Sequence, residues 1–180
     1  MSEQPSLLHG PEPQQAIGRV VLAASGIEAA VATILACLWD PPEEAIRKVA
    51  GRPASWQRDE LRRQVERKLR GRLRDELLAW ADRVEEEARR RNRIVHATWY
   101  RVDKPEPGSV AFVHCGKEAA WAGYAVVEQV SVADLQAMGM VIDSVAMTGL
   151  ILLAKVESYL AGDLPALFID GPPRPQPSGN

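Results

Sequence analysis

The sequence predicts a mainly α-helical protein with a short β-structured insertion before its last helix. Apolar residues recur every three or four positions at about residues 14–39 and 132–160, which is the spacing of one helical face. Residues 72–98 are highly charged but carry the same spacing. Between residues 100 and 130 the pattern changes to the period of two that is typical of strands. We therefore expect a bundle of four to five helices with a hairpin or three-stranded insertion.

The first predicted helix runs from about Gln14 to Trp39 and ends before Pro41-Pro42, because proline interrupts the helical hydrogen bonds. Glu28 falls within its apolar stripe. A buried carboxylate is costly unless it is paired, so one interpretation gives Glu28 a basic partner on another helix, with Arg91 as the candidate. The other interpretation places Glu28 at the edge of the stripe, in water. The stripe consists of Ile17, Val20, Val21, Ala24, Ile27, Val31, Ile34, Leu35 and Leu38.

Three helices are expected in the middle of the chain. Residues 42–50 form a short one that ends at Gly51-Arg52-Pro53, and a second begins near Ser55 and reaches Arg70 with a narrow apolar seam. The third covers residues 72–98. The seam of the second consists of Leu61, Val65 and Leu69, and the inward stripe of the third consists of Leu73, Leu77, Trp80, Val84, Ala88, Arg91 and Val95.

The insertion should contain three strands, at residues 100–103, 110–115 and 124–130. Residues 104–108, which contain two prolines and a glycine, and residues 116–123, which begin and end with glycine, then form the connections between them. His114 lies on the middle strand. We interpret it as a half-exposed strand residue without chemistry, although a flap of this kind could fold over a phosphate site.

The last helix is expected over residues 132–160, with Ser131 as its N-cap. Its apolar run from Val145 to Ala154 is bounded by Asp143 and Lys155. This run is about ten residues long, whereas a membrane span needs roughly 20. We therefore predict a core or dimer helix and no membrane association. The inward seam consists of Leu135, Met138, Ile142, Val145, Gly149, Leu152, Val156 and Leu160.

Composition favours one ordinary soluble domain. The 180 residues carry a formal net charge of -2 and 46% hydrophobic residues, which does not indicate a generally basic nucleic-acid coat. Cys37 and Cys115 have no neighbouring metal-ligand partner, and no P-loop or Gly-rich dinucleotide turn is found. We expect no cofactor, no metal and a cytoplasmic location. Residues 1–13 are predicted to be a disordered arm, and residues 162–180 a Pro-rich flexible tail.

The stretch that carries chemistry is Arg91-Asn92-Arg93-Ile94-Val95-His96, near the end of the long charged helix. At about 100° per residue, Asn92 and His96 lie about 40° apart on neighbouring turns, and Arg91 is one step round from Asn92. Guanidinium matches phosphate geometry, and imidazole exchanges a proton near neutral pH. The stretch therefore predicts an anion site with an acid or base. A capping or core role for His96 is the alternative.

This stretch, followed by Ala97-Thr98-Trp99, resembles the R-x4-6-H signature of the HEPN family of small helical nucleotide-binding and ribonuclease domains. The family includes toxins and phage-defence proteins. The resemblance implies a HEPN-like bundle over residues 14–161, with the β insertion at about 100–130. It further implies a metal-independent endoribonuclease that cleaves RNA through its own 2′-hydroxyl and leaves a cyclic phosphate.

Members of the family are usually homodimers in which two motifs face each other, so the resemblance implies a composite site with a second His96 and Arg91. In that site His96 is the general acid or base, Arg91 holds the phosphate, Asn92 orients His96 or contacts the phosphate, and Glu28 fixes Arg91. The flanking arginines would contact RNA; they are Arg89, Arg90 and Arg93.

Two alternatives stay open. The first is a non-catalytic HEPN-like dimer that binds a nucleotide, RNA or a protein partner such as an antitoxin through the same basic residues. The second is a structural helical domain in which Arg91 and Glu28 form a buried ion pair. The intact trio of Arg91, Asn92 and His96 favours the enzyme.

Overall fold

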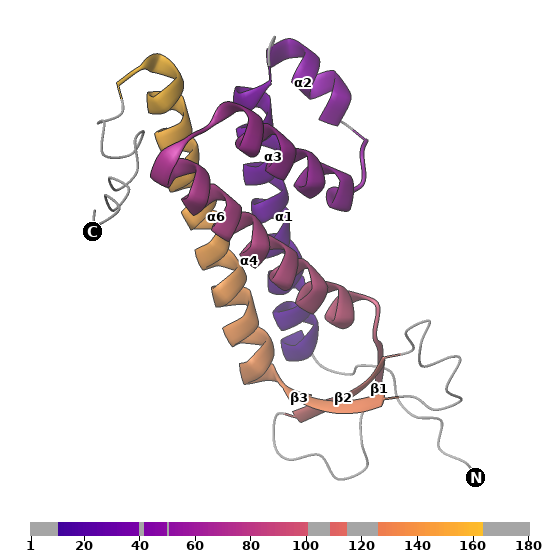
Figure 1. The fold of residues 1–180 in the computed structure, drawn as a ribbon. Helices are drawn as coiled ribbons and strands as arrows, with labels where there is room; N and C mark the ends of the chain where they lie inside the picture. Colours follow the sequence, from indigo (N-terminus) through magenta and orange to yellow (C-terminus); the bar gives the residue numbers. More distant parts are fainter. Residues whose placement is uncertain (1–10, 40–41, 50, 101–108, 115–125, 164–180) are drawn as a thin grey trace, which may run out of the picture. The chain divides into compact units, whose positions relative to one another are not determined.

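The computed structural model confirms that the protein is mainly α-helical (Figure 1). It describes residues 11–39, 42–49, 51–100, 109–114 and 126–163. Five helices lie within these ranges: α1 (Pro11–Leu38), α2 (Pro42–Val49), α3 (Ala54–Lys68), α4 (Gly71–Val95) and α6 (Val132–Ala161). Three strands accompany them: β1 (Thr98–Tyr100), β2 (Ser109–His114) and β3 (Val126–Ser131).

Helix ends differ from the predicted ones by a few residues. α1 begins at Pro11, so residues 11–13 of the predicted arm are helical, because proline is well tolerated in a first helical turn. α3 begins at Ala54, one residue before the predicted Ser55, with Pro53 as its N-cap, and it ends at Lys68 instead of Arg70. α4 ends at Val95, three residues early. The rest of the predicted arm and the tail from residue 164 lie outside the described residues.

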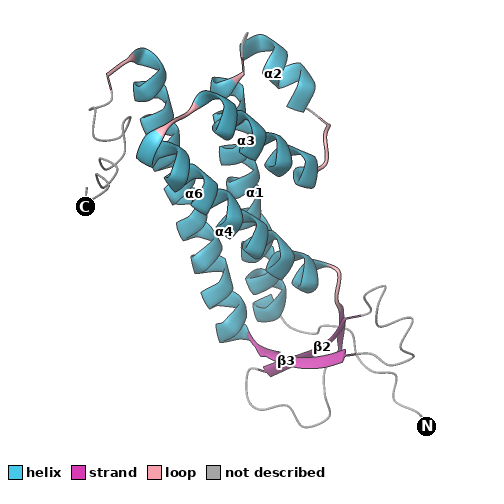
Figure 2. Ribbon diagram, in the orientation of Figure 1, coloured by secondary structure: helices cyan, strands magenta, loops and turns pink. Residues whose placement is uncertain are grey.

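The strands pair in the order β1-β2-β3, and both pairings are antiparallel (Figure 2). Thr98 is opposite Val113, and His114 is opposite Val126. The predicted strand at residues 100–103 shares only Tyr100 with β1. The side chain of His114 and the whole of Cys115 lie outside the described part of the structure.

Ser131 caps α6 as predicted. The backbone N–H of Asp134 donates to Ser131 Oγ at 3.0 Å, while the Ser131 N–H donates to Asp134 Oδ2 at 2.9 Å. This reciprocal pair is a capping box with Asp in place of Glu. The Ser131 hydroxyl also donates to Asp134 and, with the backbone bond, holds the pKa of that carboxyl below its usual value.

The chain divides into two compact units, which we describe separately. The first contains residues 1–26 and 86–144, and the second contains residues 27–85 and 145–180. In the first unit a small core forms around Trp99, whose indole N–H donates to the Ile94 carbonyl at 3.1 Å. Its buried members are Ala16, Ile94, Trp99 and Leu135.

In the second unit the predicted inward faces are buried. Leu61, Val65 and Leu69 of the α3 seam have no exposed surface. Trp80 of α4 is buried, and its indole N–H donates to the Val145 carbonyl of α6 at 2.9 Å. Leu160 is the exception among the predicted inward residues, because 49% of its surface is exposed.

Ion pairs connect the helices of the second unit. Arg62 of α3 contacts Asp82 of α4 at 3.0 Å and Glu85 of α4 at 2.8 Å. Lys155 of α6 contacts Glu76 of α4 at 2.6 Å, and both side chains are more than two-thirds buried. The hydrogen bond from Lys155 lowers the pKa of the Glu76 carboxyl below its usual value and outweighs the opposing effect of burial.

Two helices, α1 and α6, are long and apolar enough to cross a membrane. Core helices of soluble proteins pass the same test, and so do signal sequences near an N-terminus, as α1 is. Of the most apolar 18-residue window, 44% is buried inside the protein in α1 but only 28% in α6. The expected absence of a membrane association therefore stays a prediction, and the low burial of α6 needs an explanation of its own.

Gly149 should be required for the packing of the second unit. A Cβ at this position would lie 2.5 Å from Trp80 Cζ2 and 2.9 Å from Ala30 Cβ, closer than real Cβ contacts. We expect Gly149→Ala to lower the free energy of unfolding by about 1–3 kcal/mol, as overpacking does, in urea denaturation. Gly139→Ala on the same helix is the control, because its Cβ would meet nothing nearer than 3.9 Å. Equal effects of the two substitutions would contradict the close approach.

The Glu76–Lys155 pair should stabilise the fold in a pH-dependent way. Because the folded-state pKa of Glu76 is depressed, its contribution is fully present above the unfolded pKa and is lost as pH falls through the folded pKa. Lys155→Met should therefore cost about 1 kcal/mol at pH 7 and progressively less in acid, measured by urea denaturation across a pH series. Lys48→Met, which removes an exposed pair with Glu44, should cost less at pH 7. A Lys155→Met effect independent of pH would refute the linkage.

Candidate functional site

The predicted site residues lie at the end of α4, in the first unit. Arg91 is half-buried, and its Nη1 donates to Asn92 Oδ1 at 2.9 Å. His96 is the first residue after the helix, and its backbone N–H donates to the Asn92 carbonyl at 3.0 Å. Asn92 and His96 are both exposed. The structure therefore places a guanidinium against an amide, with a solvent-facing imidazole one turn further on.

Burial of Ile94 sets these directions. Ile94 is 2% exposed and belongs to the core around Trp99. Residues two positions before and two positions after a buried helical residue point about 160° away from it. Asn92 and His96 occupy those positions, so both face solvent. The Ile94 carbonyl also accepts from Ala97 N at 3.4 Å, which closes the helix directly behind His96.

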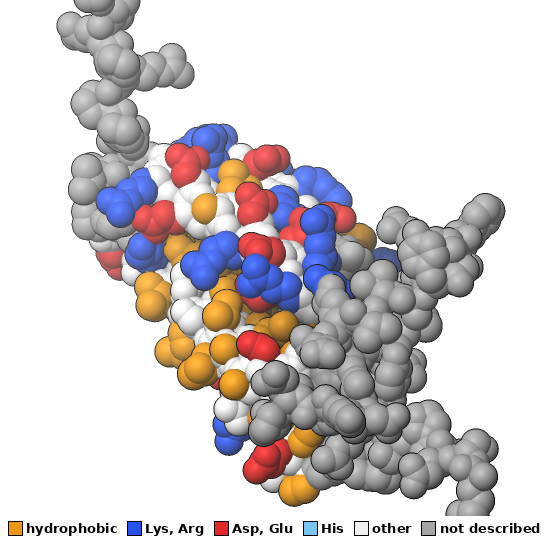
Figure 3. Space-filling model, turned by 90° about the horizontal axis from the view of Figure 1, so that it is seen from below, with side chains coloured by type: hydrophobic (Ala, Val, Ile, Leu, Met, Phe, Trp, Pro, Cys, Tyr) orange, Lys and Arg blue, Asp and Glu red, His pale blue; other side chains and the backbone are white. Residues whose placement is uncertain are grey.

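The basic cluster is less available than its sequence indicates. Arg90 contacts Glu86 Oε1 at 2.7 Å and Glu87 Oε1 at 3.0 Å, so two carboxylates hold one guanidinium. Arg89 and Arg93 are exposed. In the view of Figure 3, Lys and Arg side chains are interspersed with Asp and Glu. Its two ion pairs therefore limit what Arg90 can offer to a phosphate.

Glu28 is exposed, so the interpretation that buries it in the apolar stripe of α1 is wrong. The edge position explains this, because Ile27 and Val31 beside it are buried and rotate Glu28 toward water. The proposed support of Arg91 by Glu28 stays a prediction.

A buried carboxylate was missed by sequence reasoning. Glu87 is 5% exposed and lies one turn before Arg91, on the face that continues from Val84 to Ile94. Its Oε1 accepts from Arg90, while its Oε2 is buried without a hydrogen-bond partner in the described part of the chain. Counted from Val84, the period of about 3.6 residues falls between Glu87 and Ala88, and choosing the apolar residue led to Ala88, which is only half-buried.

Two further buried polar residues lie on α3, in the second unit. Glu60 and Gln64 are 4% and 6% exposed, and Gln64 Nε2 donates to Glu60 Oε1 at 2.7 Å. Arg63 pairs with the same carboxylate. The pair occupies the side of α3 next to the apolar seam, so it supports packing and lies apart in sequence from the motif.

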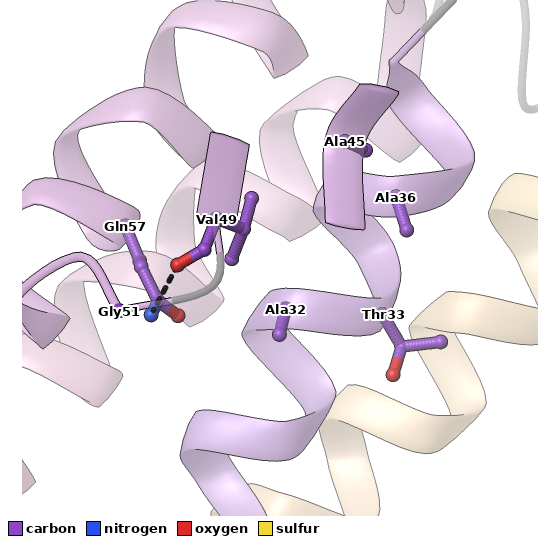
Figure 4. A pocket seen from close by; sticks show the side chains of 7 residues that line it. All are labelled: Ala32, Thr33, Ala36, Ala45, Val49, Gly51 and Gln57. Carbon is purple, nitrogen blue, oxygen red and sulfur yellow. Dashed lines mark hydrogen bonds between the residues drawn. The ribbon is translucent and has the colours of Figure 1, made fainter. Parts of the chain in front are cut away.

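The second unit also contains an apolar pocket of about 450 Å³ (Figure 4). Gln57 closes one side by donating to the Val49 carbonyl at 3.5 Å and to the Arg52 carbonyl at 3.1 Å. None of the predicted site residues lines this pocket. Its lining consists of Ala32, Thr33, Ala36, Ala45, Val49, Gly51 and Gln57. In the described ranges no group of three or more His, Cys, Asp or Glu residues could hold a metal ion.

Trp99 should hold the end of α4 in place. Trp99→Phe keeps most of the buried ring but removes the hydrogen bond to the Ile94 carbonyl. We expect a loss of about 0.5–1.5 kcal/mol in the free energy of unfolding and faster amide hydrogen exchange at Val95, His96 and Ala97. Trp56→Phe on α3, where the ring lies against Arg52, is the control and should leave exchange at these three amides unchanged. Unaltered exchange in Trp99→Phe would show that the indole does not fix this turn.

Comparison of the chain with models of protein families, with curated proteins and with solved structures finds no match.

Proposed function

We propose that this protein is a metal-independent endoribonuclease of HEPN toxin or phage-defence type. The observation that supports the proposal is the arrangement at the end of α4, where Arg91 Nη1 bonds Asn92 Oδ1 at 2.9 Å and His96 is exposed one turn later. RNA cleavage of this kind requires a cation that holds the phosphate, a base and an acid, and this arrangement offers the cation and one imidazole that can move a proton.

The reaction uses the RNA itself as the nucleophile. A base takes the proton from the 2′-hydroxyl, and the 2′-oxygen forms a bond to the adjacent phosphorus. The bond from phosphorus to the 5′-oxygen breaks, and an acid gives that oxygen a proton. The products are a 2′,3′-cyclic phosphate and a 5′-hydroxyl, so no external water or redox partner takes part.

In this mechanism His96 is the general acid or base, and Arg91 stabilises the negative charge of the phosphorane. Asn92 orients the site: its carbonyl group already holds Arg91, and its amide nitrogen is available for the phosphate or for His96. One motif supplies one imidazole, whereas the reaction needs an acid and a base. A homodimer with two motifs across a two-fold axis would supply both.

The second candidate is a non-catalytic dimer that binds RNA, a nucleotide or a protein partner such as an antitoxin. The ion pairs of Arg90 with Glu86 and Glu87 reduce the positive charge beside the motif, which within this candidate favours a protein partner over RNA or a nucleotide. The exposed imidazole has no evident part in such binding, which is why we prefer the enzyme.

His96 should be needed for cleavage but not for folding. We expect the purified protein to cleave mixed cellular RNA in excess EDTA and to leave cyclic-phosphate ends. His96→Ala and Arg91→Lys should each reduce the rate about 10²–10⁴-fold, measured as fragment formation on a denaturing gel. Arg83→Ala, an exposed arginine earlier in α4, is the matched control and should cleave like the parent.

Circular dichroism of each variant would establish that it is folded. Absence of cleavage by a folded parent protein would refute the enzyme and leave the binding function. Cleavage that survives His96→Ala would refute the assigned role of the imidazole.

A further inference from the structure

Exposed large hydrophobic side chains are concentrated on one helix. Within the described ranges seven such residues keep more than a third of their surface exposed, and six of them lie on α6. The seventh is Leu22 on α1. Figure 3 shows hydrophobic side chains on the face that it draws. The six on α6 are Met140, Val141, Met147, Leu150, Ile151 and Leu160.

Four residues in the second half of α6 form a continuous surface, which we call the α6 stripe: Met147, Leu150, Ile151 and Ala154. Their spacing of three, one and three positions places them on one side of the helix. Met147, Leu150 and Ile151 are 58%, 50% and 59% exposed, and Ala154 is exposed as well. No charged side chain lies within the stripe.

The opposite side of α6 is buried. Val145, Leu152 and Val156 have at most 4% of their surface exposed, and Gly149 packs against Trp80. A helix that is apolar on all sides is normally buried on all sides. Exposed apolar surface of this kind marks an interaction site in a soluble protein. The stripe therefore needs an occupant.

Charge positions on α6 argue against lipid as that occupant. Asp143 and Glu157 are exposed at the two ends of the stripe, one turn before Met147 and nearly one turn after Ala154. The apolar face between them covers 13 residues, or about 20 Å at 1.5 Å per residue, whereas the hydrocarbon core is about 30 Å thick. Both carboxylates would enter the bilayer, which is costly.

The same positions fit a second copy of this chain. In an antiparallel pair with the two-fold axis between Leu150 and Ile151, these two residues face each other, and Met147 faces Ala154 of the second copy. A long side chain then meets a small one, as good packing requires. Asp143 faces Ser158, and Glu157 faces Ser144, so no like charges meet. A parallel pair would instead bring Asp143 against Asp143 and Glu157 against Glu157.

We infer that the α6 stripe is the surface on which a second copy of the chain docks, as an antiparallel helix pair across a two-fold axis. This inference names an interface, and it does not rest on RNA cleavage. The interface is isologous, since each copy contributes the same four residues.

Sedimentation equilibrium over a concentration series tests the inference. The parent protein should reach twice the chain mass of 19.8 kDa. Met147→Glu combined with Ile151→Glu places four carboxylates at the axis and should return the mass to that of one chain. Leu22→Glu, at a residue that is 73% exposed but lies on α1, is the control and should remain a dimer. Circular dichroism confirms that each variant is folded.

A cysteine cross-link tests the geometry directly. In a chain with Cys37→Ser and Cys115→Ser, Leu150→Cys lies beside the axis and should form an intermolecular disulfide under mild oxidation. Leu22→Cys should not. A parent protein that stays monomeric at every concentration, or cross-linking of both cysteines to the same extent, would overturn the inference. Flotation with phosphatidylcholine and phosphatidylserine vesicles that is lost in the double Glu variant would overturn it in favour of a membrane surface.

The outcomes separate this inference from the proposed ribonuclease. A dimer that the stripe variant dissociates, in a protein without cleavage, would support the interface and refute the enzyme. A cleaving protein whose mass is unchanged in the stripe variant would support the enzyme and refute the interface.

Discussion

The indole of Trp80 reaches a carbonyl in the middle of α6, and this contact constrains the packing of the second unit. Val145 O already accepts the N–H of Gly149 within the helix, and its second lone pair accepts the Trp80 N–H at 2.9 Å. The ring can approach that carbonyl because position 149 has no Cβ; one would lie 2.5 Å from the ring. A buried indole without an acceptor would be costly, so the tryptophan and the glycine depend on each other. The same Cβ would lie 2.9 Å from Ala30 Cβ, so α1 also packs closely against α6 at Gly149.

Helices with a regular spacing of apolar residues could be predicted from the sequence. Which side of a helix faces the core could not be predicted where it depends on the neighbouring elements. The stripes of α1, α3 and the first half of α4 appear as buried faces because apolar residues at helical spacing have one inward side. α6 is apolar all round, so its pattern did not distinguish the face toward Trp80 from the exposed one, and Leu160 was assigned inward although it is 49% exposed. On α4 the buried face continues through Glu87, which the choice of apolar residues excluded. At these positions the direction in which the helix points a side chain, and not the side chain's hydropathy, determines whether the residue is buried.

The candidate site shows the same division. Arg91, Asn92 and His96 could be placed on one patch because their relation depends only on helix rotation and on burial of Ile94. Trp99 follows the motif closely in the sequence. Its indole N–H donates to the Ile94 carbonyl, and nothing in the residue pattern predicted that hydrogen bond. Whether each arginine can bind a phosphate could not be predicted in this way, because that depends on which carboxylates lie close enough to pair with it. Glu86 and Glu87 are close to Arg90 in the helix, and their contacts convert one predicted phosphate ligand into an ion pair.

The proposed ribonuclease and the proposed α6 interface place a joint condition on the assembly. A closed homodimer has a single two-fold axis, so the axis that pairs two α6 stripes must also relate the two copies of His96. An RNA phosphate can be held by Arg91 and flanked by an acid and a base only if both imidazoles lie within reach of it along that axis. If they do not, a second interface is needed, and two distinct isologous interfaces on one chain generate an assembly larger than a dimer. If the protein cleaves RNA as proposed, the oligomeric state of the cleaving species therefore decides whether the stripe builds the proposed site or joins complete sites together.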